Sequence, residues 1–139
     1  SNAAKKYVTS ITLQSNYMSS SDATLLQYPV NVPVQSGALT AVVEYSNGES
    51  VTLPVDGTKF QLFGTERFVS SVIGQRVPLV LTYRLASDEF AAQVNEVGGE
   101  RFITKEYSLE VMDADGAYTV KLYPFPVWVN AAPVGVLVV

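Results

Sequence analysis

The feature that most constrains the fold is a hairpin pattern in residues 38–57, ALTAVVEYSNGESVTLPVDG. Apolar and polar residues alternate on both sides of the Asn47-Gly48 pair. The first run places Leu39, Ala41, Val43 and Tyr45 on one face, and the second alternates through Val51, Leu53 and Val55. Alternation is typical of strands with one dry face, and Asn-Gly supplies the positive-φ residues of a type I′ turn. The sequence therefore predicts a β-hairpin here.

Strand patterns recur about every ten residues along much of the chain, with short turn-forming gaps between them. Further strands are predicted at residues 7–13, 58–64, 67–74, 76–85, 101–111 and 117–129. The first of these strands places Tyr7, Thr9, Ile11 and Leu13 on one face. A second turn pair, Asp56-Gly57, leads into the strand at residues 58–64.

Two segments interrupt this series of strands. Residues 15–37 mix serines, two prolines and short apolar pairs. They predict loop and sheet-edge structure, because proline cannot donate to a strand ladder. Residues 86–100 are mostly polar and contain Gly98-Gly99 near their end. We expect a long connection there, with room only for a short helix near residues 88–94.

Closely spaced strands with no helical patterns between them predict an all-β fold, an antiparallel β-sandwich or barrel. The chain has 139 residues and is 47% hydrophobic, which suits one folded domain with a sizeable core. Residues 1–3, Ser-Asn-Ala, are typical of the remnant of a cleaved expression tag, so the expected domain covers residues 4–139. The chain ends inside the apolar run VGVLVV, and we expect it to be a piece of a longer protein.

The expected core residues lie on the apolar strand faces. They are Leu39, Val43, Leu53, Phe60, Leu79, Leu81, Leu109, Val120 and Trp128. Residues 126–139 are the most apolar stretch, but they fall short of the ~20 residues that span a bilayer, and Pro133 and Gly135 interrupt them. We expect core strands there and no membrane span. If this stretch pairs with a partner, the isolated chain should self-associate into a homo-oligomer.

The composition removes most catalytic chemistry. The chain has no cysteine and no histidine. Thiolate nucleophiles, disulfides, Cys-based zinc sites and the Ser-His-Asp triad are therefore absent, and so is the commonest general base near neutral pH. We expect no enzyme and no cofactor. An acid-based glycosidase stays open as a third hypothesis, because it needs only two carboxylates in a cleft.

The charge pattern argues against nucleic acid as a partner. Thirteen acidic residues stand against nine basic ones, which gives a net charge of -4. The basic residues are scattered and form no stripe that could neutralise phosphates. The expected partners are other protein subunits or neighbouring domains of the same chain.

The stretch MDADGAYTV, residues 112–120, carries the one candidate metal site, Asp113 and Asp115 before Gly116. Calcium takes about six or more oxygen ligands, and an EF-hand loop closes with a bidentate glutamate. No glutamate follows Gly116, and Asp and Gly are also common turn residues. We therefore favour a turn over a calcium loop, and predict that residues 107–111 and 117–123 pair as antiparallel strands.

Aromatic residues give a candidate ligand surface near the C-terminus, at Tyr123, Phe125 and Trp128. A set of rings on one open face would suit stacking against a sugar. Tyrosine and tryptophan are also ordinary strand residues that bury well at sheet margins. Packing is therefore the favoured interpretation, and a ligand surface is the alternative.

The hairpin LTAVVEYSNGESVTLPVDGTKF resembles the bacterial Ig-like modules of phage virion proteins and bacterial surface proteins. The likeness covers residues 38–85 and rests on a valine-rich strand, an aromatic residue, Ser-Asn-Gly and a threonine-valine strand. The chain departs from immunoglobulin proper, because it has no cysteine pair and its single tryptophan, Trp128, lies near the C-terminus. The resemblance implies an Ig-like sandwich with a spacer, assembly or attachment role and no catalytic motif.

These observations lead to one main functional hypothesis and one alternative. The main hypothesis is a non-enzymatic structural or interaction module of a larger assembly, in a bacteriophage virion or tail protein. The alternative is a carbohydrate- or cell-surface-binding adhesin domain. The sequence does not fix localisation, although a virion or an extracellular surface is the expected setting.

Overall fold

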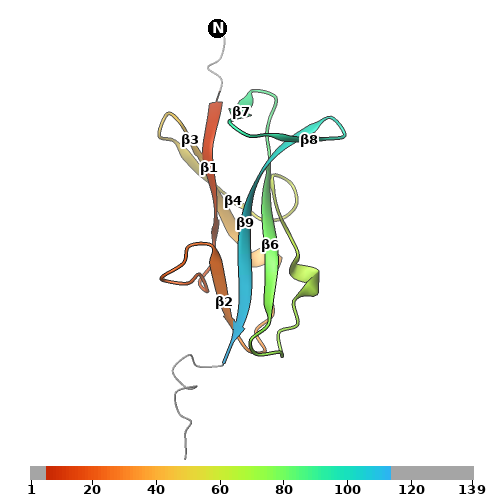
Figure 1. The fold of residues 1–139 in the computed structure, drawn as a ribbon. Coiled ribbons are helices and arrows are strands. Elements are labelled where there is room, and N and C mark those ends of the chain that lie inside the picture. Colours follow the sequence, from red (N-terminus) through yellow and green to blue (C-terminus); the bar gives the residue numbers. More distant parts are fainter. Residues whose placement is uncertain (1–5, 114–139) are drawn as a thin grey trace, which may run out of the picture.

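A computed structural model describes residues 6–113 of the chain, and these residues form nine strands and two short 3-10 helices (Figure 1). The strands are β1 (Lys6–Gln14), β2 (Leu25–Pro29), β3 (Thr40–Tyr45), β4 (Ser50–Pro54), β5 (Phe60–Phe63), β6 (Arg76–Arg84), β7 (Glu89–Ala91), β8 (Asn95–Val97) and β9 (Glu100–Met112). The 3-10 helices are η1 (Ser36–Ala38) and η2 (Thr65–Arg67). The predicted all-β class is confirmed for this part of the chain.

The strands form two sheets that pack face to face. One sheet has the order β4-β3-β1-β7, and the other has the order β2-β9-β6-β5, with β8 also paired to β9. Most pairs are antiparallel, as predicted, but β1 pairs with β7 and β2 pairs with β9 in parallel. Both exceptions are short strands added to a long strand that runs in the same direction.

The predicted hairpin forms between β3 and β4, with a different turn. Gly48 has a φ of 91°, whereas Asn47 does not have a positive φ, so the turn is not type I′. Instead Gly48 N–H donates to the Tyr45 carbonyl (3.0 Å), and the Tyr45 N–H donates to the Glu49 carbonyl (2.9 Å). This is a three-residue loop in which a left-handed glycine follows the turn. The Asn47 side chain stabilises it by accepting from Glu49 N–H at 2.9 Å.

The core lies between the sheets, and most of the predicted core residues are in it. Leu39, Val43, Phe60, Leu79, Leu81 and Leu109 are buried. Leu53 is only partly buried, because β4 is the outer strand of its sheet. Val120 and Trp128 lie outside the described residues. Burying each large apolar side chain stabilises the fold by roughly 1.5–3 kcal/mol, which holds the sheets together.

The predicted buried face of β1 is wrong at the start of the strand. The pairing of β1 with β3 shifts register between Val8 and Ser10, so the strand carries a β-bulge there. A bulge inserts one residue and moves the following side chains to the other face. Val8 therefore enters the core with Ile11 and Leu13, while Tyr7 is 42% exposed.

Two predictions about the middle of the chain are also wrong. Residues 67–74 form no strand but a loop that begins in η2, and it exposes the side chains of Val69, Val72 and Ile73. Residues 86–100 contain no helix, and they hold the short strands β7 and β8. Three-residue strands are too short to show alternation, and they form because each finds an edge of a longer strand. Residues 15–37 contain β2, an edge strand, as the prolines suggested.

Within residues 6–113, no helix is long and apolar enough to cross a membrane. The described helices are single turns of three residues.

Candidate functional site

One side of the molecule leaves parts of two strand edges without a strand partner among residues 6–113. β7 covers the edge of β1 only at residues 6–8. β8 and β2 cover the edge of β9 only at residues 100–102 and 108–112. Both long strands descend in Figure 1 and lie side by side. We call the region between residues 9–14 and residues 103–107 the open side.

The backbone of β9 presents hydrogen-bonding groups to the open side. The carbonyl of Arg101 faces β6, because it accepts a hydrogen bond from the N–H of Leu85, the residue after β6, at 2.9 Å. The N–H of Ser108 points away from β6 and donates to the carbonyl of Thr24 at 2.8 Å. Strand groups alternate with a period of two, so the N–H and carbonyl groups of Thr104 and Glu106 face the open side.

The backbone of β1, in the facing sheet, also presents hydrogen-bonding groups to the open side. The N–H of Leu13 donates to the hydroxyl of Tyr107 at 2.8 Å, in a buried position. This N–H therefore points away from β3, and the same alternation turns the backbone groups of Ile11 toward the open side. Tyr107 bridges the two sheets and closes the lower end of the open side.

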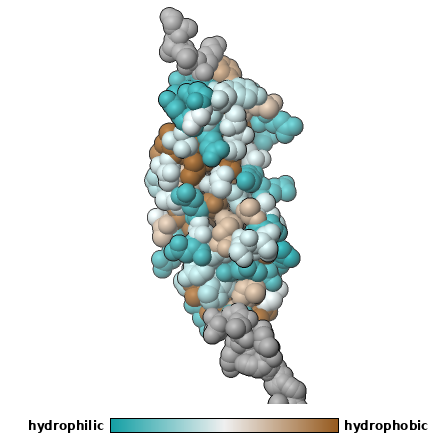
Figure 2. Space-filling model, turned by 90° about the vertical axis from the view of Figure 1, so that its left-hand side faces the viewer, coloured by the Kyte–Doolittle hydropathy of each residue, from teal (hydrophilic) through white to brown (hydrophobic). Residues whose placement is uncertain are grey.

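A hollow of about 480 Å³ lies in the open side, and we call it the upper hollow. It is lined by residues 7–11, 91–93 and 103–105. Val8, Ile11 and Ile103 are buried beneath it. Figure 2 looks onto this side of the molecule, where apolar surface shows between polar side chains. An apolar floor beside unpaired backbone edges is what an added strand requires.

A buried carboxylate fixes the strand that ends the open side at the top. Glu89 on β7 is 4% exposed, and both of its side-chain oxygens accept hydrogen bonds. Its donors are the hydroxyls of Tyr45 (2.5 Å) and Tyr83 (2.9 and 3.0 Å) and the N–H of Ala86 (2.8 Å). Lys59 Nζ stands 3.9 Å away. Glu89 thereby ties β3 of one sheet to β6 of the other.

The surroundings of Glu89 set the charge of the cluster. Burial alone would raise the pKa of Glu89, but the Ala86 N–H, the two tyrosine hydroxyls and Lys59 together hold that pKa below its ordinary value. Burial is also the main reason that the pKa of Tyr83 and the pKa of Tyr45 are raised. The cluster is therefore one carboxylate with neutral hydroxyl donors at neutral pH. Because both oxygens of Glu89 are already occupied, the arrangement is suited to holding strands rather than to proton transfer.

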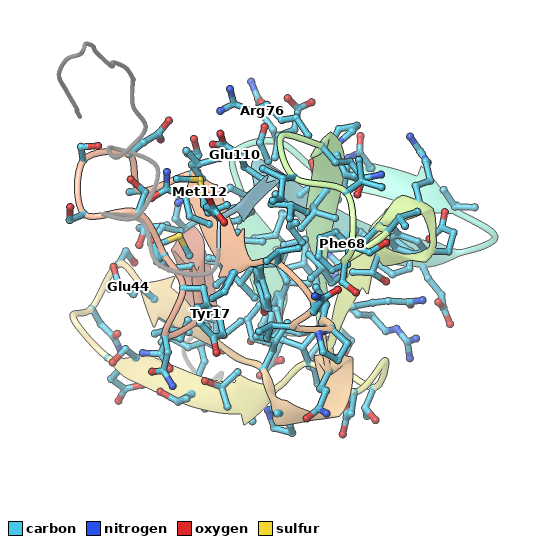
Figure 3. The ribbon with its side chains drawn as sticks, turned by 90° about the horizontal axis from the view of Figure 1, so that it is seen from below. Tyr17, Glu44, Phe68, Arg76, Glu110 and Met112 are labelled. Carbon is cyan, nitrogen blue, oxygen red and sulfur yellow. The ribbon has the colours of Figure 1, made fainter. Side chains whose placement is uncertain are left out.

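A second hollow of about 670 Å³, the lower hollow, lies below Tyr107. It is lined by residues 13–18 and 38–40, together with Tyr28, Val32, Pro33 and Gln35. A row of rings lies beside it: Tyr17 is 4.5 Å from Tyr28, and Tyr28 is 5.9 Å from Phe68, between ring centroids. Figure 3 looks at this end from below and labels Tyr17 and Phe68, the two outer rings of the row.

Most of the residues that the sequence proposed as sites lie outside the described part of the chain. Asp113 directly follows β9, and Asp115, Tyr123, Phe125 and Trp128 lie outside the described residues. Within residues 6–113, no group of three His, Cys, Asp or Glu side chains could hold a metal ion. For residues 112–120, the calcium loop and the turn are therefore both untested predictions.

The predicted strand pairing after β9 meets an obstacle in the described residues. Residues 117–123 lie outside them, but the proposed partner, residues 107–111, lies within β9. Over residues 108–110, β9 already pairs with β6 on one edge and with β2 on the other. A strand has only two edges, so both edges of β9 are occupied over residues 108–110, and the pairing with residues 117–123 stays an untested prediction.

Comparison with protein-family models, with curated proteins and with solved structures finds no match for this chain. The resemblance to Ig-like modules therefore stays a prediction.

Sequence reasoning missed Tyr17, which lines the lower hollow, and the roles of Glu89 and Tyr107, which link the two sheets beside the hollows. Glu89 lies in a segment predicted as a connection, and Tyr17 lies in one predicted as loop and edge. Tyr107 was placed correctly in a strand, but strand alternation says nothing about the partner of its hydroxyl. The one sequence signal for a buried Glu89 was the neighbouring Phe90 in an otherwise polar segment. An acidic residue beside an aromatic one is too common to mark a buried carboxylate.

Proposed function

We propose that this chain is a non-enzymatic structural module, an Ig-like sandwich that joins neighbouring copies within a larger assembly of a bacteriophage virion or tail. The observation that carries the proposal is the open side. Exposed strand edges are templates for pairing with another chain, and proteins that do not use them usually cover them. Here the exposed edges of β1 and β9 face one apolar hollow.

The proposed occupant of the open side is the segment 117–123, AYTVKLY, of a second copy. Its alternation places Tyr118, Val120 and Leu122 on one face and Thr119 and Lys121 on the other. The first face suits the apolar floor of the upper hollow, and the second suits solvent. Main-chain hydrogen bonds would supply affinity, and the alternate side chains would fix the register.

The length of the chain argues against insertion of this segment into its own molecule. Tyr118 follows Met112 by six residue positions, which span at most roughly 20 Å when fully extended. The rise of β9 from Met112 back to Glu106 consumes about the same length. No length of chain is then left to pass around β2, which already pairs with this edge of β9. A neighbouring copy is free of this constraint.

The experiment compares two lysine substitutions on adjacent positions of the full chain by sedimentation velocity. Val120→Lys places a charge on the face that enters the hollow, so it should abolish the concentration-dependent association expected of the wild type. Thr119→Lys adds the same charge on the opposite face and should leave association unchanged. A wild-type chain that remains monomeric at high concentration would refute the proposal, and so would equal effects of the two substitutions.

A further inference from the structure

Among residues 6–113, the lining of the lower hollow contains no charged side chain. The thirteen described lining residues are apolar, aromatic, hydroxyl or carboxamide residues. In this part of the chain a phosphate or carboxylate ligand would find no cation, and a cationic ligand would find no acid. The volume of about 670 Å³ lies within the range of roughly 300–1,000 Å³ that is usual for small-molecule sites. The hollow is therefore suited to a neutral ligand.

Three carboxamides stand along this hollow with hydrogen-bonding groups to spare. Asn16 and Gln35 have side chains without a hydrogen-bond partner among residues 6–113. Gln14 uses its oxygen to accept from the Thr40 hydroxyl at 2.8 Å, which leaves its NH₂ group available. A carboxamide can both donate and accept, as a sugar hydroxyl can, so the two groups match each other without charge.

Tyr17 gives the hollow an aromatic wall in a fixed position. Its N–H donates to the Ser15 hydroxyl (3.1 Å), and its carbonyl accepts from Gln27 N–H (2.7 Å). The ring packs against Tyr28, which is itself buried. Burial raises the pKa of Tyr28, so its hydroxyl stays neutral throughout the physiological pH range.

We propose that the lower hollow binds a neutral saccharide, with one sugar ring lying against Tyr17 and its hydroxyls bonded to Asn16, Gln35 and the NH₂ group of Gln14. Aromatic rings bury the C–H face of a sugar, and carboxamides fix the orientation of its hydroxyls. The site is separate from the upper hollow, because the two hollows share no lining residue among residues 6–113. Binding there does not depend on association of the chain.

The test uses the full chain on an array of neutral and anionic oligosaccharides, followed by calorimetric titration of the best neutral one. Tyr17→Ala should weaken binding at least tenfold. Gln35→Ala, at an exposed position that carries no hydrogen bond within the described residues, should weaken it severalfold without affecting folding. Tyr7→Ala is the matched control, because Tyr7 is an exposed tyrosine that lines the upper hollow, and it should not change affinity.

Three results would overturn the saccharide site. The first is an array with no neutral sugar above background, and the second is equal binding of anionic sugars. The third is a neutral sugar whose affinity is unchanged by both Tyr17→Ala and Gln35→Ala. If Tyr17→Ala perturbs folding, Gln35→Ala and Tyr17→Phe decide the matter, because a phenyl ring keeps the stacking face and should retain most of the affinity.

Discussion

At the scale of single residues, Glu89 shows how this fold tolerates a buried charge. An isolated carboxylate would be very costly to bury, so it must be hydrogen-bonded and paired. Here Tyr45, Tyr83 and the Ala86 N–H surround it, and Lys59 lies nearby. Removing the charge should leave these donors facing a group that cannot accept from all of them.

Glu89→Gln should lower the free energy of unfolding at pH 7 by about 2–3 kcal/mol, because hydrogen bonds to a charged group are replaced by weaker ones. The folded pKa of Glu89 is lowered, so its contribution is present above the unfolded value near 4.5 and is lost as pH falls through the folded pKa. The difference between wild type and variant should therefore shrink below about pH 4.5. Urea unfolding at pH 7 and pH 3 measures it.

The matched control for this substitution is Glu49→Gln. Glu49 is 60% exposed and lies 3.9 Å from Lys6, so its pair is a surface ion pair. Such pairs contribute about 0–1 kcal/mol, and the control should be nearly neutral. A stability difference for Glu89→Gln that is the same at both pH values would contradict the assigned role of the charge.

At the scale of elements, the sequence predicted strands where local alternation decides the outcome. The strand of residues 40–45 keeps its buried face because Ala41, Val43 and Tyr45 alternate without interruption. The face of β1 before the bulge could not be predicted, because a bulge depends on pairing with β3 and not on the residues of β1. Residues 67–74 look strand-like locally, but they pair with no strand among the described residues, and Val69, Val72 and Ile73 are exposed.

The two edges of β9 should respond differently to proline. Thr104→Pro removes an N–H that faces the open side, so we expect a loss below about 1 kcal/mol and reduced association. Lys105→Pro removes an N–H directed at Leu81 on β6, and should cost at least about 2 kcal/mol. Chemical denaturation and sedimentation of both variants test this. Equal loss of stability would show that the edge at Thr104 is already paired.

At the scale of the whole molecule, the candidate sites arise where distant segments meet. The lower hollow joins residues 13–18 to residues 32–40, and the open side joins β1 to β9, which are nearly a hundred residues apart, as Leu13 and Tyr107 illustrate with a separation of 94. Periodicity is a local signal and cannot place such segments beside each other. The sequence predicted the strands that build the sites, and the arrangement of the sheets determined which side chains line them.

The proposed pairing of residues 117–123 of one copy with the open side of another predicts that stability depends on protein concentration. Association that occurs only between folded molecules stabilises them by mass action, by up to about 1.4 kcal/mol for each tenfold rise in concentration above the dissociation constant. The urea midpoint of the wild type and of Thr119→Lys should therefore rise with concentration, whereas that of Val120→Lys should stay constant. If all three chains share one concentration-independent midpoint, the open side is not occupied by a second copy, because no other interaction in the proposal distinguishes positions 119 and 120.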